Sequence, residues 1–140
     1  MKKIITIAAV LALAPTFASA DSFQEAFESN RAMYGKNHTF EWNGKNFSTN
    51  HEEEVEASVA ATKENALDLI AKAKAKNKEA ATLGFEWKLT GGILKDAQKA
   101  ADAGEYRKAL DLAAQAKYHS RMGIQQHAYA QSNWHLSVPQ

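Results

Sequence analysis

The sequence contains no cysteine. It therefore offers no disulfide, no thiol nucleophile, no lipidated N-terminal cysteine and no attachment site for a c-type haem. An exported protein can use disulfides for stability, so an exported chain without cysteine depends on packing alone.

An excess of charge of either sign is also missing, since 17 basic residues stand against 16 acidic ones. Basic surfaces attract nucleic acids and anionic membranes, and a near-neutral chain gives no such signal. We therefore expect no nucleic-acid partner and no anionic-membrane partner.

No apolar run is long enough to cross a membrane, because a spanning helix needs roughly 20 apolar residues. The longest run, residues 4–14, follows Lys2 and Lys3 and precedes the small residues Ala18-Ser19-Ala20. This order is typical of a secretory signal peptide, with an uncleaved anchor as the alternative. We predict that residues 1–20 are cleaved, that a 120-residue chain starts at Asp21 in the periplasm, and that it does not insert stably into the membrane.

Residues 21–49 predict a short helix followed by a β-hairpin. Ser22 and Glu25 are placed as a capping box, and Gly35 ends the helical pattern. Asn43-Gly44 is a strong signal for a two-residue hairpin turn, and aromatic residues alternate with polar ones on both sides of it. An isolated hairpin is marginal in water, so we expect its aromatic face to pack on a helix.

Residues 50–132 predict a helical bundle. We expect Asn50 to cap one long helix whose first turn places Glu52, Glu53 and Glu54 at the positive end of the helix dipole. The expected inward stripe of this helix is Val55, Val59, Thr62, Ala66, Leu69, Ile70 and Ala73. A run of lysines on its later turns, Lys72, Lys74, Lys76 and Lys78, is typical of a solvated face, with a docking patch as the alternative.

Two further helices are expected after a glycine-containing break. Thr90 is a candidate cap for a helix from about Ile93 to Ala103, and Gly104 suits the left-handed position that ends it. The last helix runs from Tyr106 to about Ser132, and residues 133–140 are expected to form a flexible tail. The predicted fold is mainly α: an antiparallel three-helix bundle preceded by a short helix and a β-hairpin.

No pattern of catalytic or metal-binding residues stands out. His119 and His127 are eight residues apart, which is about 12 Å along a helix axis, so they cannot share one metal ion unaided. The three adjacent glutamates are better explained by the helix dipole than by acid–base chemistry. We expect no enzyme activity, no metal site and no cofactor.

One stretch of the chain resembles a known family. The residues that carry the resemblance are Glu86, Trp87, Thr90, Leu94, Lys95, Ala97, Ala100, Gly104, Tyr106, Lys108, Ala109, Leu112, Ala113, Ala116, Lys117, Gly123 and Gln126. Their pattern is similar to that of the small periplasmic SoxXA-binding proteins, and with the preceding helix it spans residues 55–127. The resemblance implies a non-catalytic accessory protein of thiosulfate oxidation that binds a Sox c-type cytochrome and raises its activity. Residues 23–49 lie outside the matched pattern.

Candidate contacts with such a partner are Trp87 and Lys88 in the predicted loop, and Arg121 and Gln125 on the last helix. Trp87 has two readings: it either plugs the end of the bundle or anchors a partner. Two other functions stay open, namely a helical envelope adaptor or stress-related structural protein without a redox role, and a metal or haem binder that uses the histidines. An alanine-rich helical face could equally support a dimer.

Overall fold

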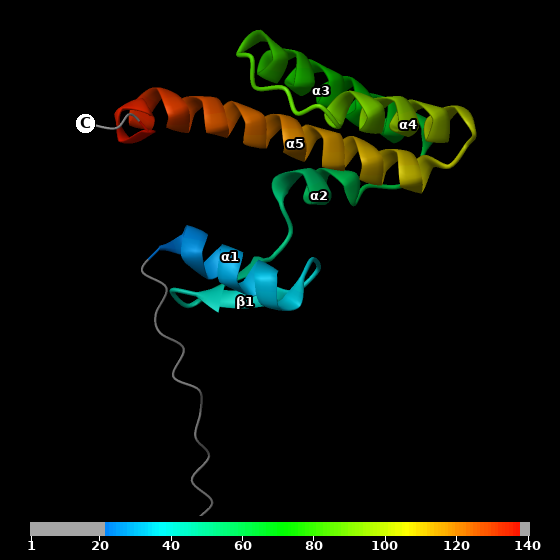
Figure 1. The fold of residues 1–140 in the computed structure, drawn as a ribbon. Helices are drawn as coiled ribbons and strands as arrows, with labels where there is room; N and C mark the ends of the chain where they lie inside the picture. Colours follow the sequence, from blue (N-terminus) through cyan, green and yellow to red (C-terminus); the bar gives the residue numbers. More distant parts are fainter. Residues whose placement is uncertain (1–21, 138–140) are drawn as a thin grey trace, which may run out of the picture. The chain divides into compact units, whose positions relative to one another are not determined.

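The computed structural model describes residues 22–137, which are mostly helical with one small antiparallel sheet (Figure 1). The predicted signal peptide and the last three residues of the predicted tail lie outside the described residues. The chain divides into two compact units between Thr49 and Asn50. No helix within residues 22–137 combines the length and the apolar character that a membrane span requires.

The first unit contains helix α1 (Phe23–Tyr34) and strands β1 (Thr39–Trp42) and β2 (Lys45–Ser48). The predicted capping box is confirmed: the Ser22 hydroxyl accepts a hydrogen bond from the Glu25 amide, and the Glu25 carboxylate accepts one from the Ser22 amide. Gly35 follows the helix with a φ of 73°, which glycine adopts at little steric cost.

The β-hairpin turns at Asn43 and Gly44, as predicted, and both have positive φ. The register places Phe40 opposite Phe47. Phe23 of α1 packs on this pair, with its ring centroid 4.8 Å from that of Phe47. The aromatic face of the hairpin is therefore covered by a helix, as an isolated two-stranded sheet requires.

The second unit begins with two helices where the sequence predicts one. Helix α2 (Glu52–Ala57) ends after six residues, and five residues separate it from α3 (Lys63–Thr82). The Thr62 hydroxyl accepts a hydrogen bond from the Asn65 amide and so caps the new helix. Arg107 donates hydrogen bonds to the carbonyl oxygens of Ala57 and Val59, both at 2.7 Å, and so satisfies backbone acceptors at the break.

This break changes which residues face inward. The predictions for Val55, Val59 and Thr62 are wrong, since all three residues are exposed, Val55 to 53% and Val59 to 44%. The start of α2 also differs, because the cap residue is His51 and not Asn50, with the Glu54 carboxylate accepting from the His51 amide. The later part of the predicted stripe is confirmed by four buried residues, Ala66, Leu69, Ile70 and Ala73.

The remaining elements are α4 (Thr90–Asp102), α5 (Tyr106–Asn133) and the 3₁₀ helix η1 (Trp134–Ser137). Gly104 has a φ of 79° and separates α4 from α5, as predicted. Thr90 is not a cap: it is the first residue of α4, it is fully buried, and its hydroxyl has no hydrogen-bond partner among the described residues. Within the part of the tail that the structure describes, Asn133 is the last residue of α5 and residues 134–137 form η1 directly after it.

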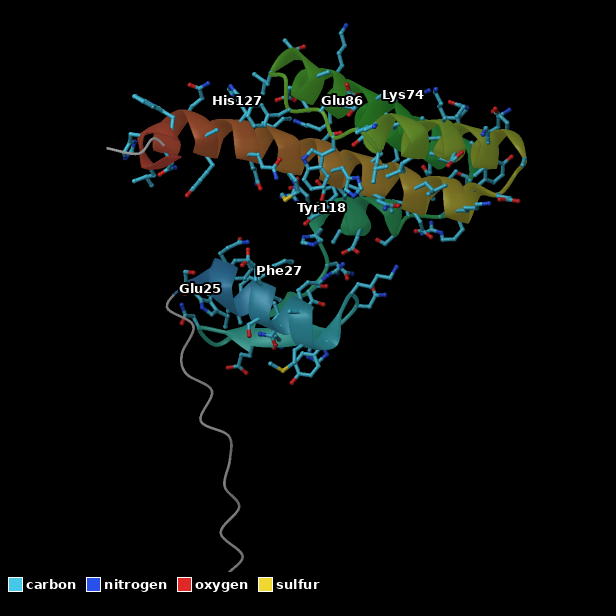
Figure 2. The ribbon with its side chains drawn as sticks, in the orientation of Figure 1. Glu25, Phe27, Lys74, Glu86, Tyr118 and His127 are labelled. Carbon is cyan, nitrogen blue, oxygen red and sulfur yellow. The ribbon has the colours of Figure 1, made fainter. Side chains whose placement is uncertain are left out.

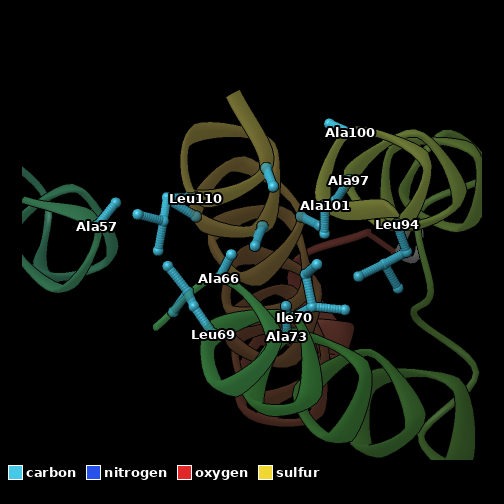
Figure 3. Packing of buried hydrophobic residues seen from close by; sticks show 14 residues of the cluster. Ala57, Ala66, Leu69, Ile70, Ala73, Leu94, Ala97, Ala100, Ala101 and Leu110 are labelled. Atoms are coloured by element: carbon cyan, nitrogen blue, oxygen red, sulfur yellow. The ribbon is translucent and has the colours of Figure 1, made fainter. Parts of the chain in front are cut away.

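The core of the second unit lies between α3, α4 and α5, which contact one another pairwise, and α2 adds Ala57 against α5 (Figure 3). Ten of its fourteen buried residues are alanine, and the others are Leu69, Ile70, Leu94 and Leu110. Small side chains let the helices approach closely but remove little apolar area from water per residue. Specific polar contacts between helices therefore matter for this unit.

Candidate functional site

The loop between α3 and α4, residues 83–89, lies directly against α5. Gly123 of α5 makes this approach feasible, because a Cβ atom at that position would be 2.2 Å from the carbonyl oxygen of Phe85. Any larger residue would push the loop away from the helix.

Two aromatic side chains of this loop rest on α5. The Trp87 indole nitrogen donates a hydrogen bond of 2.9 Å to Gln126 Oε1, and its ring centroid is 5.0 Å from that of His119. The Phe85 ring is 5.3 Å from the ring of His127. Trp87 thus plugs the space against α5, and only part of its side chain stays accessible.

An open hollow of about 360 Å³ lies beside Trp87 on the outer face of α5. Its lining residues are Trp87, Tyr118, Met122, Gln125, Gln126 and Tyr129, none of which is charged. The hollow combines aromatic rings, a thioether and amide groups, and Tyr129 is 67% exposed. Such a surface can bury an apolar side chain of another molecule and hydrogen-bond its polar groups.

One end of the hollow is held in place by α2. Tyr118 is labelled on α5 in Figure 2. The centroid of its ring lies 4.5 Å from that of His51, which precedes α2, and 5.3 Å from the Arg121 guanidinium carbon. Arg121 in turn donates two hydrogen bonds to Glu53, at 2.6 and 3.0 Å, and pairs with Glu52 at 3.0 Å. These contacts fix the position of Tyr118.

The Glu53 carboxylate is buried, with 1% of its side chain exposed. The sequence predicts only an interaction with the helix dipole for Glu53 and does not predict this burial or the pairing with Arg121. Burial raises the pKa of Glu53, but the Arg121 hydrogen bonds, the backbone amide and the charges of Arg121 and Lys117 outweigh it, and the net shift is downward. The same pair raises the pKa of Arg121. Lys117 also pairs with Glu56, so Lys117 and Arg121 of α5 together form ion pairs with three glutamates of α2, Glu52, Glu53 and Glu56.

The four predicted contact residues have different positions. Trp87 and Gln125 line the hollow, and Lys88 is exposed on the neighbouring loop. Arg121 forms an ion pair with Glu53, and 24% of its side chain is exposed. It contacts Tyr118, which lines the hollow, but does not line the hollow itself. Sequence reasoning missed four lining residues, Tyr118, Met122, Gln126 and Tyr129. Three of these share one helical face with Gln125, a spacing that could have revealed them.

The histidines do not converge. His119 and His127 pack on different aromatic rings, and residues 22–137 contain no group of three or more metal-ligating side chains. Burial lowers the pKa of His119, because desolvation disfavours the charged ring.

The lysine run of α3 lies on its accessible side. Lys72 pairs with Asp68 and Lys76 pairs with Glu79, both within the helix, and Lys74 donates to Gln98 of α4. Exposed pairs of this kind contribute little to stability, because water and salt screen the charges. The lysines of α3 therefore form a solvated helix face.

No family model, curated protein or solved structure matches the chain.

Proposed function

We propose that the protein is a non-catalytic binding module of the periplasm, in which α3, α4 and α5 form an antiparallel three-helix bundle. Its partner is a c-type cytochrome of sulfur oxidation, whose activity it stimulates. The hollow beside Trp87 is the contact surface.

The hollow carries the proposal because of its composition. Tryptophan, tyrosine and methionine are enriched at the centres of protein interfaces, and charged residues are depleted there. The hollow has all three enriched types and no charge. A half-buried tryptophan fixed by a hydrogen bond also loses little conformational freedom when a partner binds it.

The identity of the partner rests on the family resemblance. Three of the residues that carry it, Trp87, Gly123 and Gln126, lie where the loop approaches α5, and two of them, Trp87 and Gln126, line the hollow. The resemblance and the candidate surface therefore fall on the same part of the chain.

The test is thiosulfate-dependent cytochrome reduction by the Sox proteins of the source organism, with and without the purified protein. We expect a saturable stimulation. The Trp87→Ala variant is expected to need at least about tenfold more protein for half-maximal stimulation, because truncation of a central interface aromatic costs about 2 kcal/mol. Trp134→Ala is the matched control, since Trp134 is exposed and does not line the hollow.

Gln125→Ala separates binding from folding. Its side chain is exposed, so the variant should retain the circular dichroism spectrum and thermal stability of the parent while binding more weakly. If the protein neither stimulates nor binds the cytochrome, the proposal fails, and the envelope adaptor without a redox role becomes the better hypothesis.

A further inference from the structure

The outer face of α5 carries a regular repeat of side chains. Tyr118, Met122, Gln125 and Tyr129 are separated by four, three and four residues, and all four line the hollow. Contact positions in a coiled coil have this alternation of three and four, which averages 3.5 residues. The face therefore has the geometry that receives another α-helix.

The C-terminal part of α5 extends beyond the ends of α3 and α4 (Figure 1). Within the described chain, residues 128–137 make hydrogen bonds and ring contacts only with other residues of α5 and η1. Short helical segments without tertiary packing are marginal in water. A second helix along this face would supply the missing packing.

The charge pattern favours a second copy of this chain as that helix. Arg121 is the last charged residue of the sequence, counting Asp, Glu, Lys and Arg, and it is already paired with Glu53. Two copies of such a face meet without like-charge repulsion, and burial leaves no unpaired charge.

The spacing of the repeat fits an antiparallel arrangement. A spacing of four, three and four reads the same in both directions along the helix. A two-fold axis between Met122 and Gln125 places Tyr118 opposite Tyr129 of the second copy, and Met122 opposite its Gln125. Each contact then occurs twice, as a two-fold interface requires.

We infer that α5 pairs with α5 of a second copy as a short antiparallel coiled coil centred between Met122 and Gln125. Tyr129 of each copy enters the hollow formed by Trp87, Tyr118 and Met122 of the other. Gln125 supplies a polar group at a contact position, which selects one register over alternatives. The inference does not depend on the cytochrome proposal. Because the second copy and the cytochrome would occupy the same hollow, the dimer and the cytochrome complex exclude each other.

Sedimentation velocity across the micromolar range tests the dimer in the absence of any partner. We expect a monomer–dimer equilibrium for the parent protein. Tyr129→Glu should raise the dissociation constant at least about 100-fold, because each dimer would bury two unpaired carboxylates. Gln131→Glu adds the same charge to the same helix off the contact face and should leave the equilibrium unchanged.

Both variants are compared with the parent by circular dichroism, since Tyr129 and Gln131 are exposed and neither change should affect folding. A parent protein that stays monomeric throughout, or a dimer insensitive to Tyr129→Glu, overturns the inference. Neither result bears on cytochrome stimulation, which is measured separately.

Engineered cysteines test the register, since the chain has none of its own. The proposed axis places Gln115 opposite Ser132 of the second copy, whereas each lies about 25 Å along the helix from its own counterpart. Mild oxidation of mixed Gln115→Cys and Ser132→Cys chains should therefore form a disulfide between the two variants, and neither variant alone should cross-link. Efficient cross-linking of either variant with itself, or none in the mixture, refutes this register.

Discussion

Gly123→Ala is the substitution whose effect on folding stability follows most directly from the structure. At an unobstructed interior helix position, replacing glycine by alanine stabilises by about 1 kcal/mol. Here the new Cβ would lie 2.2 Å from the carbonyl oxygen of Phe85, and real Cβ atoms essentially never come closer than 3.0 Å to such an atom. The loop must therefore move away from α5, which disturbs the packing of Phe85 on His127 and the hydrogen bond from Trp87 to Gln126.

We expect a net destabilisation of about 1–3 kcal/mol, since overpacking of this kind costs more than the gain in helix propensity. For a unit of this size each kcal/mol corresponds to a fall in Tm of roughly 4–8 °C. Urea unfolding followed by far-UV circular dichroism measures the change. Gly92→Ala is the matched control, because Gly92 lies in α4 with no atom within 4 Å of its added Cβ, and it should be neutral or slightly stabilising. If Gly123→Ala is as stable as the parent, the close approach of the loop to α5 is wrong.

Three further predictions concern buried polar groups. Arg121→Met should destabilise the protein by about 3 kcal/mol because it leaves the buried Glu53 carboxylate unpaired, and adding Glu53→Gln should recover much of this loss. Because folding lowers the pKa of Glu53, the ion pair stabilises above the unfolded value near 4.5 and its contribution is lost as pH falls through the folded value. The parent should therefore lose more stability than Glu53→Gln when urea unfolding is repeated below pH 4.5; equal losses would refute this assignment. Thr90→Val should raise the free energy of unfolding by about 1 kcal/mol, since it replaces a buried hydroxyl that has no partner within residues 22–137 by a methyl group of similar size; a decrease would show that the hydroxyl is satisfied.

The candidate site could be predicted only in part. Trp87 and Gln125 were identified because a loop tryptophan and a helix-surface glutamine are visible in the sequence. Tyr118, Met122 and Tyr129 form a detectable helical stripe, but whether such a stripe faces the core or the solvent depends on where α2 and the loop pack. Arg121 was expected at the surface, and its commitment to Glu53 was not predictable because the two residues are 68 positions apart in the chain.

The sequence by itself determined the features that depend on neighbours within a few residues. The capping box at Ser22 and Glu25, the turn at Asn43-Gly44 and the helix end at Gly104 all follow from local hydrogen bonding and backbone freedom, and the structure has them where the sequence predicts them.

Only the tertiary structure decided the features that depend on distant contacts. A continuous helix from residue 50 is locally reasonable, yet Arg107 binds the carbonyl oxygens of Ala57 and Val59 at the break between α2 and α3. Burial of Glu53 depends on Arg121, and the position of Trp87 depends on the missing side chain at Gly123. In each case a contact between residues more than 30 positions apart outweighs or completes the local signal, and local sequence patterns do not specify such contacts.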